Sequence, residues 1–362
     1  MTVGRIDQVI PTLASRDAIG GHVVRLRDLL RSRGYRSDIF YGNASEDRLD
    51  HGLPVSRIGD KPSPGRVLLY QLSIGSGVAD IFRERGERKF VNYHNITPAD
   101  LLEAWIPEVG EEVRWGRAQL RDLAPVTEFA IADSHFNELE LQAAGYRSTT
   151  TVPLLIDLDS FAGSADPATA ARLERDKSVG GVDLLFVGKV SPHKGQHDLV
   201  KALAAYRRVY DPRARLRLVG GAISDGYQTA LERFAEELGL LDAIDIAGSV
   251  THEELIAYYA ASDVFVCLSN HEGFCVPLLE AMYHQLPIVA HTNTAVPETI
   301  EGAGLVLPDK NPARVAAAIH RVVEDARLRA ALAQAASERV SSFALPRVQE
   351  GFASALEGAF AA

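Results

Sequence analysis

The segment that decides the predicted fold is His271-Glu272-Gly273-Phe274-Cys275-Val276-Pro277-Leu278-Leu279-Glu280-Ala281. It follows an apolar run of strand type, residues 263–269, and continues into a segment of helix type. Gly273 allows the backbone to turn sharply, and Pro277 suits the first position of a helix, where its missing N–H costs nothing. The pattern therefore predicts a strand, a tight loop and a helix.

Such a loop is suited to an anion. The unpaired N–H groups at a helix start, together with the positive end of the helix dipole, favour a ligand such as the diphosphate of a nucleotide sugar. Glu272 lies on the loop, and the Glu280 side chain leans back toward it. Each carboxylate can accept hydrogen bonds from a pair of neighbouring hydroxyls, as on a hexose or a ribose. Taken alone, the two glutamates are equally compatible with two surface acids.

In its context, this segment resembles the Glu-x7-Glu signature of retaining nucleotide-sugar glycosyltransferases of family 4. The resemblance implies the GT-B fold, an α/β architecture of two Rossmann-like domains whose parallel sheets face each other across a cleft. It also implies that Glu272 contacts the donor sugar and that Glu280 contacts the ribose. The donor-binding residues on the loop would further include Gly273, Phe274, Cys275 and Val276.

Length and composition agree with two soluble domains. The chain has 362 residues, too many for one ordinary core, with 46% hydrophobic and 24% charged residues. We expect an acceptor domain over residues 1–158, completed by a C-terminal helix over about 346–362, and a donor domain over residues 159–345. Residues 162–181 read as a polar spacer, and residues 311–336 as helical.

Charge and cysteine content limit the partners and the compartment. The net charge of −10 argues against binding to nucleic acid, and contact with a membrane surface is possible but not indicated. Only two cysteines occur, Cys267 and Cys275, with neither zinc-site spacing nor a disulfide framework. With no signal peptide and no apolar run long enough to span a membrane, we expect a cytoplasmic protein.

The first half of the chain contributes two candidate features. A strand over residues 5–10, ending at Pro11, precedes Gly20-Gly21, which we interpret as a glycine-rich loop before a helix. By resemblance, the amides of Gly20 and Gly21 face the donor diphosphate; the alternative is a plain tight turn. His94 follows the strand over residues 89–93 and matches the histidine that in the family lies near the donor sugar, so His94 and Glu272 are the candidate catalytic residues.

The second half contributes two cations. Lys189 and Lys194 flank a turn that leads through Gly195 into a helix, and by resemblance they match the Arg and Lys-Gly pair that neutralises the leaving diphosphate. Lys189 occupies the position at which the family has Arg. An ammonium, which is a point charge, thus replaces a guanidinium that could form two parallel hydrogen bonds. Asp157-Leu158-Asp159 spells a metal-binding Asp-x-Asp, but its place at the domain crossover argues against a metal site. We therefore expect neither a metal nor any other cofactor.

Together these features predict a retaining, metal-independent transferase that moves a hexose from a nucleoside diphosphate sugar to an acceptor hydroxyl. The acceptor, a small molecule, a glycan or a lipid-linked molecule, is left open, as is the oligomeric state. Two alternatives stay open: a synthase of the same fold with a sugar-phosphate acceptor, and a catalytically inactive GT-B binding module. A dinucleotide-dependent oxidoreductase conflicts with the absence of Gly-x-Gly-x-x-Gly from the first turn.

Overall fold

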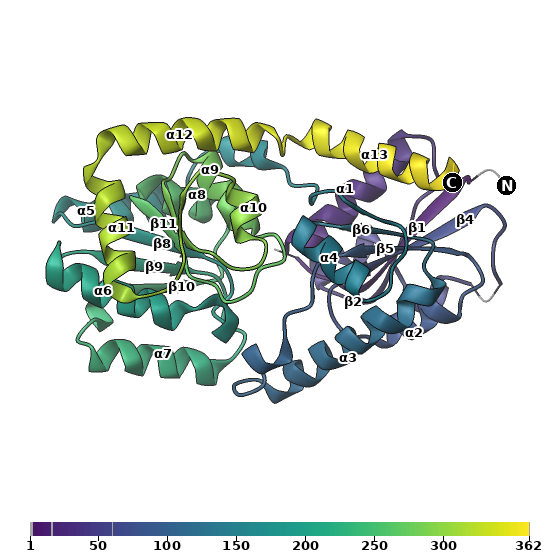
Figure 1. Ribbon diagram of the computed structural model, residues 1–362, viewed down its shortest axis with the longest axis horizontal. Helices are drawn as coiled ribbons and strands as arrows, with labels where there is room; N and C mark the ends of the chain where they lie inside the picture. The colour runs from purple at the N-terminus through teal and green to yellow at the C-terminus, as the bar shows by residue number, and fades with distance from the viewer. Residues whose placement is uncertain (1–2, 16, 60, 362) are drawn as a thin grey trace. The chain divides into compact units, whose positions relative to one another are not determined.

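The computed structural model describes residues 3–15, 17–59 and 61–361. The chain divides into two compact units: unit 1 comprises residues 1–100, 108–157 and 343–362, and unit 2 comprises residues 101–107 and 158–342. Each unit contains one sheet flanked by helices (Figure 1). Every strand pair in the two sheets is parallel, which confirms the predicted α/β class.

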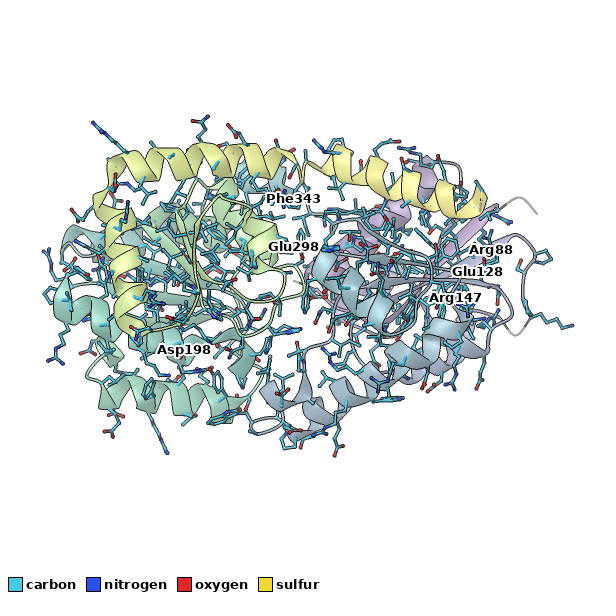
Figure 2. The ribbon with its side chains drawn as sticks, in the orientation of Figure 1. Arg88, Glu128, Arg147, Asp198, Glu298 and Phe343 are labelled. Carbon is cyan, nitrogen blue, oxygen red and sulfur yellow. The ribbon has the colours of Figure 1, made fainter. Side chains whose placement is uncertain are left out.

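Unit 1 is built on a seven-stranded sheet in the order β3-β2-β1-β4-β5-β6-β7. Its strands are β1 (Arg5–Leu13), β2 (Ile39–Ala44), β3 (Leu53–Pro54), β4 (Arg66–Leu72), β5 (Arg88–Tyr93), β6 (Phe129–Ala132) and β7 (Thr149–Thr151). Its helices are α1 (Ala18–Ser32), α2 (Gly77–Glu84), α3 (Pro107–Leu123), α4 (His135–Ala143) and α13 (Leu345–Ala361). The ion pair between Arg88 and Glu128, 2.7 Å long and labelled in Figure 2, joins the starts of β5 and β6.

The prediction that the first strand ends at Pro11 is wrong, because β1 continues to Leu13. Its pairing with β4 ends at Val9, whereas its pairing with β2 continues to Leu13. Pro11 therefore lies where β1 has a neighbour on one side only. A proline, which has no N–H to donate, is tolerated at such an edge position.

Unit 2 is built on a six-stranded sheet in the order β10-β9-β8-β11-β12-β13. Its strands are β8 (Asp183–Val187), β9 (Arg215–Val219), β10 (Ile244–Gly248), β11 (Val264–Cys267), β12 (Ile288–His291) and β13 (Leu305–Leu307). Its helices are α5 (Pro167–Ser178), α6 (Gln196–Val209), α7 (Asp225–Glu237), α8 (His252–Ala261), α9 (Val276–Tyr283), α10 (Val296–Ile300), α11 (Pro312–Glu324) and α12 (Ala326–Ser341). Apolar side chains of β8, β9 and β11 form its core with those of α6 and α11.

The expected polar spacer over residues 162–181 is largely a helix, α5. Asp166 caps it by accepting a hydrogen bond from the Thr169 N–H at 2.7 Å, and Pro167 occupies its first turn. Only Leu173 is buried among its side chains, so the helix lacks the apolar stripe by which an amphipathic helix is found in a sequence.

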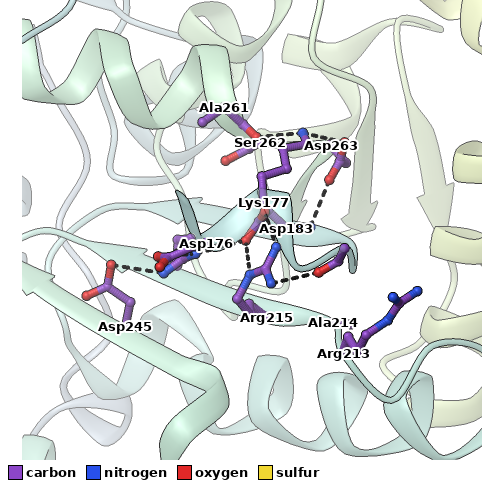
Figure 3. A network of polar contacts seen from close by, with 12 residues as sticks. Asp176, Lys177, Asp183, Arg213, Ala214, Arg215, Asp245, Ala261, Ser262 and Asp263 are labelled. Atoms are coloured by element: carbon purple, nitrogen blue, oxygen red, sulfur yellow. Dashed lines mark hydrogen bonds and ion pairs between the residues drawn. The ribbon is translucent and has the colours of Figure 1, made fainter. Parts of the chain in front are cut away.

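Ion pairs attach α5 to the sheet instead (Figure 3). Lys177 Nζ lies 2.9 Å from Asp263 Oδ1, and Asp176 Oδ2 lies 2.9 Å from Arg217 Nη2. Arg217 is itself buried in β9 beside Asp183, at 3.1 Å. These charges are far apart in the sequence, and only the fold brings them together.

Two further observations concern the C-terminal helices. The segment expected to be helical over residues 311–336 forms two helices, because Asp325 ends α11 and caps α12 with its side chain. The last helix, α13, belongs to unit 1, where Val348, Phe352 and Leu356 pack with Leu26 of α1 and with strand residues. None of the helices in the described part of the chain is long and apolar enough to cross a membrane.

Candidate functional site

The signature loop connects β11 to α9 at the carboxyl edge of the unit 2 sheet, the edge at which ligands bind in open α/β sheets. The structure has the predicted strand, loop and helix, but α9 begins at Val276, one residue before Pro277. Cys275 is the N-cap residue and has a left-handed backbone conformation, with φ 70° and ψ 67°. Its side chain accepts no capping hydrogen bond, so the side chain leaves the amides of the first helical turn uncapped.

Glu272 forms the central contact of the loop, an ion pair with Lys194. The ammonium Nζ lies 2.9 Å from Oε1 and 2.8 Å from Oε2 of the carboxylate. The Glu272 side chain is 7% exposed and that of Lys194 is 21% exposed. Burial lowers the pKa of the Lys194 ammonium, but the charge of Glu272 outweighs burial, and the pKa lies above its ordinary value. The residue expected at the donor sugar and one expected at the diphosphate thus form a single charge-balanced pair.

Gly195 allows Lys194 to reach this position. It has φ 69° between the short turn Pro192–Lys194 and the start of α6. A Cβ atom on residue 195 would lie 2.3 Å from the Leu268 carbonyl oxygen. The turn therefore approaches the end of β11 more closely than any residue with a side chain allows.

The loop between β12 and α10, together with Thr299 of α10, holds the signature loop by its backbone. Thr294 Oγ1 accepts a hydrogen bond from the Glu272 N–H at 2.9 Å and donates one to the Glu272 carbonyl at 2.7 Å. Thr299 Oγ1 donates to the Phe274 carbonyl at 2.7 Å, and the Asn293 side chain donates to the Asn270 carbonyl. We name Asn293, Thr294 and Thr299 the clamp residues. The sequence does not reveal them, because hydroxyl and amide side chains that bind another loop leave no pattern of spacing.

Glu280 lies on α9, where its carboxylate accepts a hydrogen bond from Tyr259 Oη at 2.7 Å. Burial raises the pKa of the Glu280 carboxyl above its ordinary value, against the opposing effect of this hydrogen bond. Tyr259 is itself buried and stacks on His284, with ring centroids 5.0 Å apart. The tyrosine fixes one oxygen of the carboxylate that we expect at the ribose.

The remaining candidates of unit 2 differ in exposure. Lys189 follows β8 and is exposed, and no salt bridge to its ammonium occurs among the residues that the structure describes. Gly273 and Val276 are partly buried, whereas Phe274 is buried at 6% exposure.

His193 lies next to Lys194 and forms a hydrogen bond with Ser191, in which Nδ1 of the imidazole lies 2.8 Å from Oγ of the serine. Burial, followed by the charge of Lys194, holds the pKa of the His193 imidazole well below its ordinary value.

In unit 1, the interpretation of Gly20-Gly21 as a loop is wrong. Both residues lie in the first turn of α1, which begins at Ala18 after the N-cap residue Asp17. The Gly20 amide donates to the Asp17 carboxylate at 3.3 Å, and the Gly21 amide donates to the Asp17 carbonyl at 3.0 Å. A Cβ atom on Gly20 would lie 2.3 Å from the Ala14 carbonyl oxygen, which explains glycine there by close packing.

His94 lies directly after β5, as predicted, but its side chain is only 1% exposed. Its Nδ1 lies 2.8 Å from Asp133 Oδ2 and its Nε2 lies 2.7 Å from Gln71 Oε1. The contact of its imidazole with a donor sugar stays a prediction. Asp133, which directly follows β6, is thus a direct partner of this imidazole.

A chain of hydrogen bonds favours a proton on the Nε2 atom of His94. The Val23 carbonyl can only accept, so Gln8 turns its amide N–H₂ to it, at 2.8 Å. Gln8 Oε1 then accepts from Gln71 Nε2 at 2.7 Å, and Gln71 Oε1 is left to accept from His94 Nε2–H. Burial raises the pKa of the Asp133 carboxyl, with His94 opposing the change. The result is one fixed ring orientation at the carboxyl edge of the unit 1 sheet.

Comparison with known proteins identifies the type of fold. Residues 171–339 match the family model described as glycosyl transferases group 1, a region that contains Lys189, Lys194, Glu272 and Glu280. Over 98% of this chain and 99% of the other, the structure resembles Anabaena HepE in complex with UDP and glucose, with a TM-score of 0.74 and 19% identity. A sucrose-phosphate synthase from Thermosynechococcus elongatus aligns over 99% of both chains, with a TM-score of 0.77 and 18% identity. These likenesses confirm the predicted GT-B class.

Two curated relatives are more similar in sequence. A D-inositol 3-phosphate glycosyltransferase of Kineococcus radiotolerans is 33% identical over 230 residues, 59% of this chain and 53% of that protein. A GDP-mannose-dependent alpha-(1-6)-phosphatidylinositol monomannoside mannosyltransferase of Mycobacterium tuberculosis is 30% identical over 250 residues, 64% of this chain and 63% of that protein. The chain thus spans between half and two thirds of the length of these relatives.

Proposed function

We propose that this protein is a glycosyltransferase that moves a hexose from a nucleoside diphosphate sugar to an acceptor hydroxyl, with retention at the anomeric carbon and without a metal. The observation that supports it most is the pair of Lys194 and Glu272, whose charged atoms lie within 2.9 Å of each other beside the start of α9. At this position, the cation and the helix N-terminus can bind a diphosphate, while the carboxylate binds the hydroxyls of the attached sugar.

In the proposed reaction, the bond between the anomeric carbon and the diphosphate oxygen breaks. The acceptor oxygen bonds to that carbon, and its proton passes to the diphosphate oxygen that is released. Lys194, Lys189 and the amides at the start of α9 stabilise the negative charge that develops on the diphosphate. Glu272 accepts hydrogen bonds from the sugar, and Glu280 from the ribose. Before the donor binds, Lys194 keeps Glu272 neutralised and in place.

Binding of the donor is tested by thermal shift with UDP, GDP, ADP and dTDP, alone and as sugar conjugates. A ligand that binds only the folded protein stabilises it by about 2.7 kcal/mol at a hundredfold excess over Kd. We expect the melting temperature to rise with one nucleotide family only. Folded protein that responds to none of them would favour the inactive binding module.

Catalysis is tested with Glu272→Gln, with the donor found in that screen. Loss of a charged acceptor of hydrogen bonds, worth about 1.5–3 kcal/mol, lowers kcat/KM by about 10- to 100-fold. The matched control is Glu237→Gln, an exposed glutamate at the end of α7, which should leave the rate unchanged. Equal rates in wild type and Glu272→Gln would refute the role of Glu272. The anomeric configuration of the product, determined by NMR, tests retention, and a rate unchanged by EDTA tests independence from a metal.

A second candidate concerns the acceptor. The names of both curated relatives contain an inositol phosphate, either free or in a lipid. This favours an acceptor with a phosphorylated polyol, close to the alternative of a sugar-phosphate acceptor. The test is a transfer assay with inositol 3-phosphate, phosphatidylinositol and unphosphorylated inositol, in which only the phosphorylated acceptors should yield product.

A further inference from the structure

The two cysteines of the chain, Cys267 and Cys275, lie together beside Glu272, although eight positions separate them in the sequence. Cys267 is the last residue of β11, and Cys275 is the N-cap residue of α9. The two sulfur atoms and a carboxylate oxygen of Glu272 all lie within 4.8 Å of one another. Cys267, Cys275 and Glu272 are 1%, 8% and 7% exposed, respectively, so the cluster is buried.

The backbone holds this arrangement in place. The strand end fixes Cys267, and its Sγ lies 3.5 Å from Ser269 Oγ. The left-handed conformation of Cys275 turns the chain at the start of α9, while Thr294 holds Glu272 by both its N–H and its carbonyl. Three groups that could coordinate a metal ion are therefore organised before any ligand binds.

We propose that Cys267, Glu272 and Cys275 form a binding site for a thiophilic divalent cation of the Zn²⁺ type. Two thiolates and a carboxylate match the ligands that Zn²⁺ prefers, and a water molecule completes a tetrahedral site. In such a site, Zn–S bonds of about 2.3 Å place the sulfur atoms about 3.8 Å apart. Ligand atoms that already lie within 4.8 Å need to move by only about 1 Å.

The cation competes with Lys194, whose ammonium lies within 2.9 Å of both oxygens of Glu272. Binding deprotonates both thiols, and Lys194 gives up one carboxylate oxygen. The cation then takes the place of the ammonium as the counter-charge of the Glu272 carboxylate. The Lys194 side chain is 21% exposed, and the cation enters from that side.

This site inhibits rather than catalyses, a consequence that depends on the proposed function. A cation that occupies Glu272 takes away the carboxylate assigned to the donor sugar. Glycosyl transfer is therefore expected to fall as Zn²⁺ is added and to recover with EDTA. Binding itself does not depend on glycosyl transfer and is measured separately.

The test is titration of the full chain with Co²⁺ in place of Zn²⁺, after removal of metal and in the presence of a phosphine reductant. We expect one equivalent of Co²⁺ to produce thiolate-to-metal charge-transfer absorption and the visible bands of a tetrahedral site, and Zn²⁺ to abolish both. Cys267→Ser and Cys275→Ser should each remove the charge-transfer band. Lys194→Met, which keeps both cysteines, should tighten Co²⁺ binding by on the order of tenfold, because a competing positive charge is gone.

Absence of a charge-transfer band in the wild-type protein would overturn the proposal, as would a band of unchanged intensity in both serine variants. Circular dichroism shows whether each variant is folded. If either serine variant is unfolded, the result for Lys194→Met decides: tighter binding supports the site, and unchanged or weaker binding refutes it. If the protein binds Co²⁺ in this way but transfers no sugar, the metal site is supported and the proposed function is refuted.

Discussion

At the scale of single residues, Gly195 shows how one position can place a charged side chain. Its φ of 69° lies in the left-handed region, and its Cα faces the Leu268 carbonyl so closely that a Cβ atom would lie 2.3 Å from it. We expect Gly195→Ala to lower the free energy of unfolding by more than the about 1–2 kcal/mol that the left-handed conformation alone costs a residue with a Cβ.

The matched control for this substitution is Gly239→Ala. Gly239 has φ 65°, but nothing lies within 4 Å of the position of its Cβ. Both variants carry the cost of conformation, and only Gly195→Ala adds the contact with Leu268. Urea denaturation measures both, and equal losses would show that the close approach has no energetic consequence.

His22 predicts a dependence of stability on pH. The residue is fully buried, and its Nδ1 accepts a hydrogen bond from the Leu155 N–H at 3.0 Å. Burial, followed by the nearby His94, holds the pKa of its imidazole well below the ordinary 6.5. At a pH between the pKa of the folded state and that of the unfolded state, the unfolded state binds more protons. The contribution of His22 to the free energy of unfolding is therefore complete above about pH 6.5 and decreases as the pH falls below that value.

Protonation of this single histidine lowers the free energy of unfolding by at most about 1.4 kcal/mol for each unit by which the pH falls. We expect His22→Asn, whose side-chain oxygen can accept the Leu155 N–H, to be less sensitive to acid between pH 6.5 and 5. The urea midpoint at several pH values measures the difference. A variant with the same pH dependence as the wild type would contradict this assignment.

At the scale of elements, the clamp residues show that one loop positions another. Thr294 makes two hydrogen bonds to the backbone of Glu272, each worth about 0.5–1.5 kcal/mol. Thr294→Val keeps the shape of the side chain and removes both. We expect it to reduce sugar transfer several-fold while the protein stays folded, because Glu272 is no longer held in place.

Thr294→Ser is the matched control, since serine keeps the hydroxyl group and should retain most of the activity. Steady-state kinetics measure kcat and KM for each variant. Wild-type activity in Thr294→Val would show that the hydroxyl group of Thr294 is not what holds Glu272, and an equal loss in both variants would show that the hydroxyl alone is not sufficient.

At the scale of the whole molecule, the end of the chain returns to the unit that contains its beginning. Phe352 of α13 is fully buried and packs with residues of α1 and of the unit 1 strands. We expect Phe352→Ala to destabilise unit 1 by about 3–5 kcal/mol through the cavity that it creates. Hydrogen exchange should then show loss of protection in β1, β4 and β5, with β8 to β12 unchanged.

Leu139→Ala provides the control in the same unit, because Leu139 on α4 is 50% exposed. Its effect should remain within about 0.5 kcal/mol. Equal loss of protection in both units of Phe352→Ala would show that they unfold together and that α13 does not stabilise unit 1 alone.

The strands of both sheets were largely predictable, because buried parallel strands are continuous apolar runs bounded by polar and glycine residues. The helix α5 was not, since ion pairs such as Lys177 with Asp263 attach it and only Leu173 is buried. The pair Gly20-Gly21 was misplaced because a glycine needed for close packing in a helix reads like one needed in a loop. For the site, the sequence indicated Lys194, Glu272 and Glu280 separately, but not their partners.

The sequence by itself determined the α/β class, the order of the strands along the chain and the segment on which the candidate site lies. All three features follow from short stretches of neighbouring residues, because the spacing of hydrophobic residues and the residues that favour turns are local properties of the sequence. Only the tertiary structure decided that Lys194 pairs with Glu272, that Thr294 holds the same loop and that Cys267 meets Cys275. The first two contacts join segments that follow different strands, and side-chain chemistry alone does not specify which strands become neighbours in a sheet. The two cysteines meet because the loop between β11 and α9 folds back, which the sequence spacing does not specify.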